Sequence, residues 1–257
     1  MTEGGAHLAI EASQRAGSVA LRTPGGLVDE EPVTAPAEDL VAAIDRLAGR
    51  HGVRASQLAM IALSIGPGGF TGLRTAVAAS KFIAVIAGAE LVPVPSALVV
   101  AETLGRALDG LPEVLVLLAS RQPTEARPGS AWASRLARDP GDGAWSVVEE
   151  GVRQDDDLSA LLAAAPELTV VGEADHLPAL AALAAPVRSE EPQPGAPRHR
   201  WIEPSWSASA CLVAGERLHA RGIRCAPGAL LPLYARQPEA VTLWEARERA
   251  RGSHPPR

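Results

Sequence analysis

The chain has 257 residues, of which 47% are hydrophobic and 21% charged, a composition typical of a globular protein with one large domain or two modest lobes. Its formal net charge of −6 and pI of about 5.6 argue against tRNA binding by the chain alone, because phosphate contacts need clustered Lys and Arg. Aromatic residues make up only 3% of the chain, so its core must be aliphatic.

The sequence gives little sign of a targeting peptide, a membrane-spanning segment or a disulfide. The N-terminus has no basic stretch followed by a long apolar run, so we expect no signal peptide and a cytoplasmic protein. The longest apolar stretch, residues 75–104, is interrupted by Lys81, Glu90 and two prolines, and we do not expect it to span a membrane. Cys211 and Cys225 lack metal-binding spacing, which favours reduced thiols over a zinc site or a disulfide framework.

The first elements predict a β-meander. Residues 7–10 and 18–22 are expected to form two strands around a turn at 14–17, and residues 27–28 a short third strand. A helix is predicted next, over residues 38–50. Its apolar side chains recur at helical spacing on one face, with Val41 and Ala48 beside them: Leu40, Ile44 and Leu47.

Helices and strands then alternate. The apolar run 58–65 predicts a strand covered on both faces. A glycine-rich turn leads into a helix over 73–88, followed by a strand at 91–94 and a helix at 96–108. A meander followed by this alternation favours an α/β domain.

The helix predicted at 73–88 is apolar around most of its circumference. Ala76, Ser80 and Ala84 form a stripe of small side chains that would let another backbone come close, and Phe82 and Ile86 lie around the other side. A helix of this kind is usually covered on more than one side, here by its own sheet and by a partner.

A second lobe is predicted from about residue 111. Its expected strands are short and mostly antiparallel, and they span 114–119, 131–138, 145–149 and 168–172. Residues 188–200 are proline-rich and charged, which indicates an exposed loop. A helix is expected at 207–221, and a charged, partly helical terminal segment at 237–251.

The sharpest motif is GPGGFTGLR at residues 66–74. A glycine-rich turn between a strand and a helix can bind phosphate at the helix N-terminus. The motif lacks the GK[ST] ending of a P-loop, however, and a tight turn that simply needs glycine explains it as well.

Candidates for catalysis or metal binding are poor. No two of the six histidines have HxxxH spacing, and no His–Asp pair is placed to activate Ser13 or Ser64. The acidic run at residues 155–157 indicates a solvated turn or a helix start. We therefore predict no catalytic residue, no metal site and no cofactor.

The motif GPGGFTGLR resembles GPGSFTGLR, the signature of the TsaB/YeaZ family, with Gly69 in place of Ser. LAIEAS at residues 8–13 is similar to the family's opening LALDTS, and LPLYARQPEA at 231–240 resembles its closing P-x-Y-x-R-x-x-x-A segment. The resemblance covers about the first hundred residues and the end of the chain, and is poor between about 121 and 204.

The resemblance implies an α/β fold with two lobes of the actin and sugar-kinase type (ASKHA), each a mixed β-sheet with helices. We place the lobes at residues 1–108 and 109–232, followed by a C-terminal segment, 233–257, that could pack back on the first lobe. Nucleotide-binding members carry an Asp and small residues in the first hairpin. Here that hairpin reads EASQR at residues 11–15, whose longer carboxylate and bulky neighbours fit a lobe that has lost nucleotide binding.

The implied function is that of a non-catalytic scaffold and activator in tRNA N6-threonylcarbamoyladenosine (t6A37) modification. Its partners would be TsaD, the transferase subunit, and the ATPase TsaE, with TsaC supplying threonylcarbamoyl-adenylate and tRNA held only through the complex. Two alternatives remain: an enzyme of the superfamily with peptidase-like or phosphotransferase activity, and a diverged homodimer with a structural role.

The resemblance also implies a pairing surface, in which two helices from each of two related subunits form a four-helix contact. The predicted interface residues lie in the two helices that flank the strand at 58–65: Phe70, Thr71, Leu73, Arg74, Ala76, Val77, Ser80, Ala84, Leu40, Ile44 and Leu47. In the alternative interpretation, the small-residue stripe packs internally against the sheet.

Overall fold

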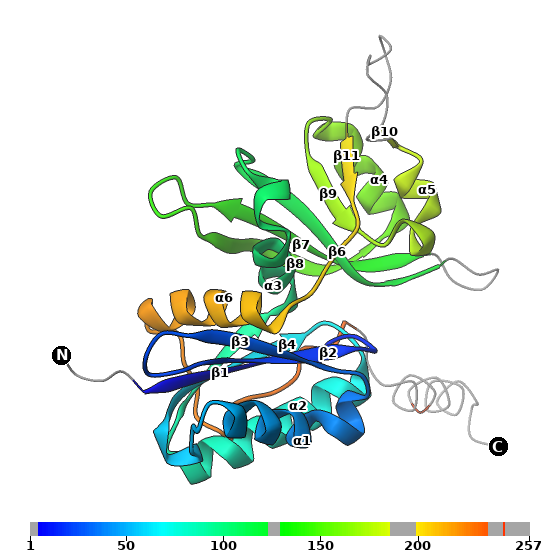
Figure 1. Ribbon diagram of the computed structural model, residues 1–257. Helices are drawn as coiled ribbons and strands as arrows, with labels where there is room; N and C mark the ends of the chain where they lie inside the picture. Colours follow the sequence, from blue (N-terminus) through cyan, green and yellow to red (C-terminus); the bar gives the residue numbers. More distant parts are fainter. Residues whose placement is uncertain (1–4, 123–128, 186–198, 236–243, 245–257) are drawn as a thin grey trace, which may run out of the picture.

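The computed structural model describes residues 5–122, 129–185, 199–235 and 244, which form two lobes stacked one above the other (Figure 1). Each lobe contains one mixed sheet with helices against it. The predicted two-lobed α/β fold of the actin and sugar-kinase type is confirmed.

The first lobe holds a five-stranded sheet in the order β3-β2-β1-β4-β5. The antiparallel meander is followed by two parallel strands, of which β4 lies beside β1 and β5 beside β4. Its strands and outer helices, in chain order, are β1 (Ala6–Glu11), β2 (Gly17–Arg22), β3 (Val28–Val33), α1 (Pro36–Arg50), β4 (Leu58–Gly66), α2 (Phe70–Ala87) and β5 (Glu90–Pro95), with the 3-10 helix η1 (Ala55–Gln57) before β4.

The second lobe repeats this plan in a six-stranded sheet, β10-β11-β9-β6-β7-β8. Its meander is again followed by a helix, a parallel strand and a second helix, and then by two further parallel strands. Its elements are β6 (Glu113–Arg121), β7 (Ser130–Arg138), β8 (Trp145–Gln154), α4 (Asp155–Ala164), β9 (Thr169–Gly172), η3 (Ala174–His176), α5 (Pro178–Ala181), β10 (Ala184–Ala185) and β11 (His199–Ile202).

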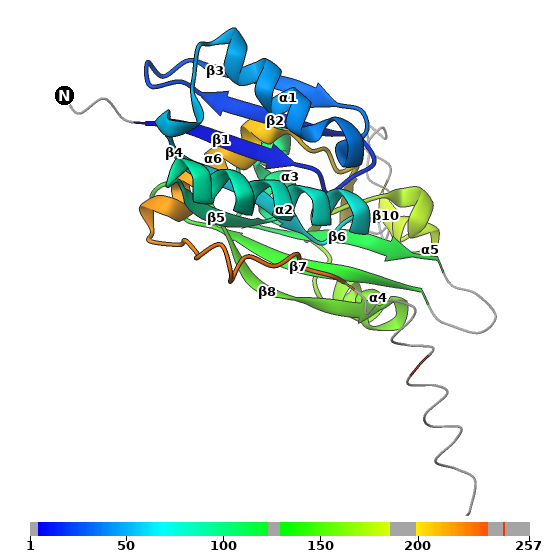
Figure 2. The same ribbon diagram turned by 90° about the horizontal axis from the view of Figure 1, so that it is seen from below.

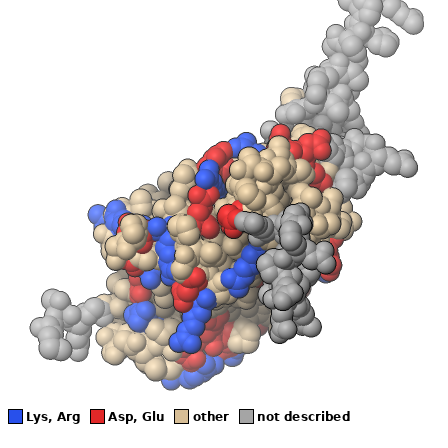
Figure 3. All heavy atoms as spheres, turned by 90° about the horizontal axis from the view of Figure 1, so that it is seen from above, with Lys and Arg blue, Asp and Glu red and all other residues tan. Residues whose placement is uncertain are grey.

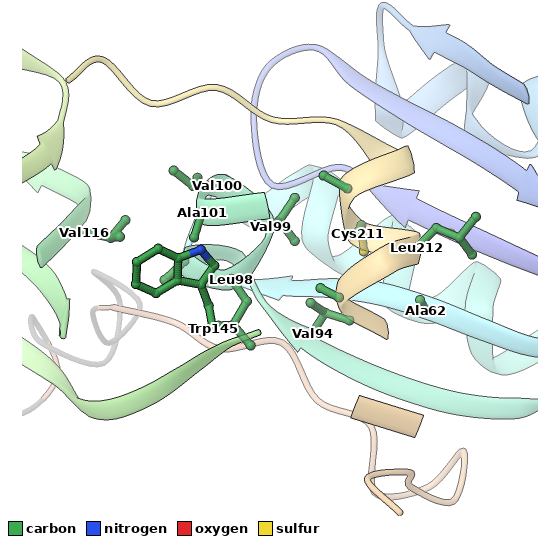
Figure 4. Packing of buried hydrophobic residues seen from close by; sticks show 14 of the residues in the cluster. Ala62, Val94, Leu98, Val99, Val100, Ala101, Val116, Trp145, Cys211 and Leu212 are labelled. Carbon is green, nitrogen blue, oxygen red and sulfur yellow. The ribbon is translucent and has the colours of Figure 1, made fainter. Parts of the chain in front are cut away.

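Two helices fill the space between the sheets: α3 (Ser96–Leu104), which continues into η2 (Gly105–Leu108), and α6 (Ala208–Ala220). Their side chains form one apolar core with the facing sides of both sheets (Figure 4). Val99 and Val100 of α3 meet Val116 and Trp145 of the second sheet in this core. The lobes are therefore joined by a continuous core.

A second core lies between the first sheet and its outer helices, α1 and α2, which run side by side (Figure 2). Leu40 and Leu47 of α1 and Leu73 of α2 are buried there. α2 ends at Gly88, whose φ of +70° lies in the left-handed region that favours glycine. Both faces of the first sheet are thus covered, as the apolar run in β4 predicted.

Several boundaries differ from prediction. β3 is six residues long and not two; it is an edge strand, where Pro32 needs no ladder hydrogen bond. α2 begins at Phe70, three residues early, because the loop is tight enough to end at Gly69. The acidic run at 155–157 opens α4, a helix that was not predicted in full. The segments 188–198 and 237–243 with 245–251 lie outside the described residues, and His199 and Arg200 belong to β11.

The chain also returns to the first lobe earlier than the expected residue 233. α6 packs on the inner face of the first sheet, and the Glu30 carboxylate of β3 accepts hydrogen bonds from the amides of Ala208 and Ser209, both at 3.0 Å. Further on, the Cys225 amide donates to the Leu91 carbonyl at 2.9 Å and covers the edge of β5. The Glu30 carboxylate next to the buried start of α6 stabilises this packing, since the helix dipole favours a negative charge there.

Candidate functional site

A cleft opens between the lobes where the first hairpin, the glycine-rich loop and the end of β6 meet. Its volume is about 910 Å³. Gln14, Arg15 and Phe70 line it from the first lobe, and Glu173 and His176 from the second. A ligand bound between the two sheets would lie here, so the side chains that line the cleft determine which ligands it can bind.

The glycine-rich loop is built for close contact with the first hairpin. A Cβ atom on Gly68 would lie 2.2 Å from the Ser13 carbonyl oxygen, so only glycine fits there. The Gly69 amide donates to that same oxygen at 2.7 Å. The glycines therefore serve a tight turn, and this amide is already used within the chain.

The two motifs from opposite ends of the sequence meet at this loop. The Tyr234 ring stacks on Phe70 with centroids 4.7 Å apart, and Arg74 Nε donates to the Tyr234 hydroxyl at 3.0 Å. The Leu233 amide donates to the Ile65 carbonyl at 2.7 Å, and the Leu233 carbonyl lies against Gly66. The closing segment is thus a strap across the start of α2.

The first hairpin turns its carboxylate away from the cleft. Glu11 is 1% exposed and lines neither the cleft nor the adjoining cavity of about 450 Å³. Its Oε1 accepts hydrogen bonds from the Ser13 amide at 2.7 Å and the Ser13 hydroxyl at 2.5 Å. Burial raises the pKa of the Glu11 carboxyl, and hydrogen bonds from Ser13 and Ser64 offset only part of that rise.

A magnesium-nucleotide held by a carboxylate of the first hairpin does not fit this arrangement. The only acidic side chain of the hairpin is held inside the core, while Gln14 and Arg15 occupy the wall of the cleft. Among the described residues, no three His, Cys, Asp or Glu side chains gather to hold a metal ion.

The predicted interface residues divide into two groups. Phe70, Thr71 and Arg74 are exposed at the start of α2. The others are buried within the chain: Leu73, Ala76, Val77, Ser80, Ala84, Leu40, Ile44 and Leu47. The small-residue stripe is therefore an internal seam, along which α2 packs closely on its own sheet and on α1. Helical spacing shows which residues share a face, but not which face the sheet covers.

The opposite side of the same two helices is exposed and apolar. Phe82 and Val85 of α2 are each 70% exposed, Ile86 is 63% exposed, and Val41 of α1 is 60% exposed. We call these four residues the α1–α2 face (Figure 2). The sequence pattern places Val41 and Phe82 on these helices, but it does not show that their side chains are exposed.

Ion pairs connect α1, which contributes Val41 to this face, to the edge of the first sheet. Its other side is tied to the edge strand β3 by Arg46 Nε to Glu31 Oε1 and Arg50 Nη1 to Asp29 Oδ2, both at 2.6 Å. Although exposed ion pairs each contribute little, several in a network fix orientation better than one. These pairs fix the orientation of α1 against the edge strand β3.

The composition of α2 reflects its exposure. Within the described residues it is the one helix long and apolar enough to span a membrane by length and composition, a weak criterion that core helices also meet. Only 28% of its eighteen residues are buried within the chain. Large exposed apolar patches on proteins mark contact surfaces.

Figure 3 shows the face of the molecule opposite α1 and α2, on which acidic and basic side chains lie interspersed. The net charge of −6 does not favour phosphate binding by the chain alone.

Comparisons with known proteins agree with this geometry. A family model described as TsaD, tRNA N6-adenosine threonylcarbamoyltransferase, matches residues 11–124, which is less than half of the chain. YeaZ from Pseudomonas aeruginosa is similar in structure, with a TM-score of 0.69, 21% identity, and coverage of 90% of this chain and 99% of that one. These matches show that the chain shares the fold of YeaZ and that its first lobe is similar to the TsaD family.

A second solved structure gives the same result for the fold. It is described as an uncharacterized protein with similarity to peptidase YeaZ from Pseudomonas aeruginosa, and has a TM-score of 0.69 and 21% identity over 90% of this chain and all of that one. No curated protein sequence matches. The family match ends near the start of the region in which the sequence resemblance is poor.

Proposed function

We propose that this chain is a non-catalytic docking subunit of the t6A modification machinery. The family match supports involvement in this tRNA modification. The observation that carries the docking role is the α1–α2 face, an exposed apolar surface on the lobe that the family model matches.

The partner we propose is a TsaD-type subunit. The first lobe itself matches the TsaD family model, so the two chains would present related helix pairs to each other. A four-helix contact of this kind would bury Phe82, Val85 and Ile86. A TsaE-type ATPase would join the pair, tRNA would bind through the complex, and the complex would act in the cytoplasm.

The hairpin supports the non-catalytic part of the proposal. A superfamily phosphotransferase would need a carboxylate facing the cleft, and Glu11 faces the core. A self-paired dimer through the same face is the second candidate, because an isologous contact needs only one apolar patch per copy.

Reconstitution tests the proposal. The purified chain is incubated with threonylcarbamoyl-adenylate and unmodified tRNA, alone and with the TsaD-type and TsaE-type subunits of the same organism. We expect modified nucleoside, measured by mass spectrometry, only when the partners are present and the chain is included. Modification by the chain alone, or by the partners at full rate without it, would contradict the proposal.

A further inference from the structure

A separate cavity of about 460 Å³ lies between α1 and the first sheet, beside η1, with Ile83 of α2 in its wall. Most of its lining is aliphatic: Leu8, Leu21, Val41, Ile44, Leu47, Ala48, Val53, Ala55, Leu58 and Ile83. It is distinct from the interlobe cleft, with which it shares no lining residue.

The chemistry of the cavity selects an apolar occupant. Its two charged lining residues, Asp45 and Arg54, are exposed and of opposite sign, so together they favour neither an anion nor a cation. Water is a poor occupant of an aliphatic cavity, because it needs two to four polar partners.

The cavity is continuous with the α1–α2 face. Val41 belongs to both, being 60% exposed and part of the lining, and Ile83 lines the cavity directly next to Phe82. Binding energy at protein interfaces concentrates where an apolar side chain fills such a pocket. A protein laid on the α1–α2 face would cover the mouth of the cavity at Val41.

We propose that this cavity is the anchor pocket of the docking surface, filled by one apolar side chain, such as leucine, methionine or phenylalanine, from a helix of the partner subunit. The inference rests on the proposed function. On this inference, the affinity for the partner depends on filling the cavity as well as on covering the α1–α2 face.

Filling the pocket from within tests the inference. Ala48 is half-buried and lines the cavity, so Ala48→Leu occupies the pocket without altering the α1–α2 face. Ala160→Leu, at an exposed position of α4 in the second lobe, is the matched control. Affinity for the TsaD-type subunit is measured by titration calorimetry, and the melting temperature of each variant is recorded.

We expect Ala48→Leu to melt at or above the wild-type temperature and to bind at least tenfold more weakly, while Ala160→Leu binds as wild type. Ala48→Val serves in the same way if the leucine variant unfolds. A folded Ala48 variant that binds within twofold of wild type overturns the anchor pocket and leaves the docking subunit intact. If the wild-type chain itself does not bind, both proposals fall. Binding of the apolar dye anilinonaphthalene sulfonate is measured on the same variants by its fluorescence. If Ala48→Leu loses the dye fluorescence of wild type but still binds the TsaD-type subunit with wild-type affinity, the cavity holds a small ligand, and the anchor pocket is overturned.

Discussion

The helix that follows the first parallel strand has eighteen residues in the first lobe, where α2 follows β4, and four in the second, where α5 follows β9. The sheets differ at this edge, because β5 lies directly beside β4 in the first lobe, whereas β11 lies between β9 and β10 in the second. The exposed positions of α2 include Phe82 and Val85, whereas those of α4, the neighbour of α5, are acidic residues and alanines. One fold plan therefore carries an exposed apolar helix surface in one lobe and an acidic, alanine-rich helix surface in the other.

The same contrast appears in the cleft. The first lobe contributes a loop and a strap locked together at Gly68 and Tyr234. The second contributes the end of β6 and the η3 turn, where His176 Nδ1 lies 2.7 Å from Glu173 Oε2. A duplicated fold can thus keep its core while each copy specialises, and we expect the function to depend mainly on the first lobe.

Placing a charge on the first lobe's contact surface gives the largest expected effect. Phe82→Asp should weaken binding to the TsaD-type subunit by about a hundredfold or more, roughly 2.7 kcal/mol, because an unpaired charge would be desolvated in the interface. Phe82 is 70% exposed in the free chain, so the fold should survive.

The control for this variant lies in the other lobe. Val148→Asp changes a side chain of β8 that is 62% exposed, and it should bind as wild type. Equal losses from both variants, measured by calorimetry, would show that the lobes do not differ in this way.

A second test breaks the link between the loop and the hairpin. Gly68→Ala places a Cβ atom 2.2 Å from the Ser13 carbonyl oxygen, and we expect the free energy of unfolding to fall by about 2–3 kcal/mol. Urea denaturation measures this directly. An unchanged midpoint would mean that the loop can move away at little cost.

A third test uses the buried carboxyl of the first hairpin. The pKa of Glu11 is raised by burial above its ordinary value of 4.5. Below that value both folded and unfolded chains hold the proton. As the pH rises, only the unfolded chain loses it, so stability falls by about 1.4 kcal/mol per pH unit until the folded pKa is passed.

Glu11→Gln removes that dependence. The stability of the variant relative to wild type should therefore increase from about pH 4.5 upward, in urea titrations at successive pH values. Parallel curves for the two proteins would show that Glu11 is ionised in the folded chain.

The smallest expected effect concerns the start of α2. Gly69 is the N-cap residue and provides no side-chain hydrogen bond, and a Cβ atom there would meet nothing closer than 3.7 Å. Gly69→Ser should stabilise the chain by a few tenths of a kcal/mol. A clear loss of melting temperature would mean that the position needs glycine, as Gly68 does.

Much of the first lobe was predictable because its signals are local. Strand alternation, the apolar run of β4 and the glycine-rich turn located the elements within a few residues. The strap at Tyr234 could be paired with the loop only through the family resemblance, because a contact between residues 160 positions apart leaves no local pattern.

The contact face and the return of α6 were not predictable in the same way. α2 is apolar on nearly all sides, so its hydrophobic pattern does not distinguish the buried stripe from Phe82 and Val85. The sequence predicts α6 as a helix, but it does not predict which lobe the helix packs on. That depends on long-range contacts such as the hydrogen bond from the Ala208 amide to the Glu30 carboxylate. The sequence shows that Glu11 replaces the Asp of the family motif. It does not show that the Glu11 side chain points into the core, where the Ser13 amide donates to it.

Hydroxyl-radical footprinting of the chain with and without the TsaD-type subunit tests the central claim most directly, because it reports the solvent exposure of individual side chains. The account predicts strong protection of Phe82 in the complex, together with Val85, Ile86 and Val41, and unchanged oxidation of Val148 and Val152 in the second lobe. Protection of the second-lobe residues with Phe82 still freely oxidised would contradict it.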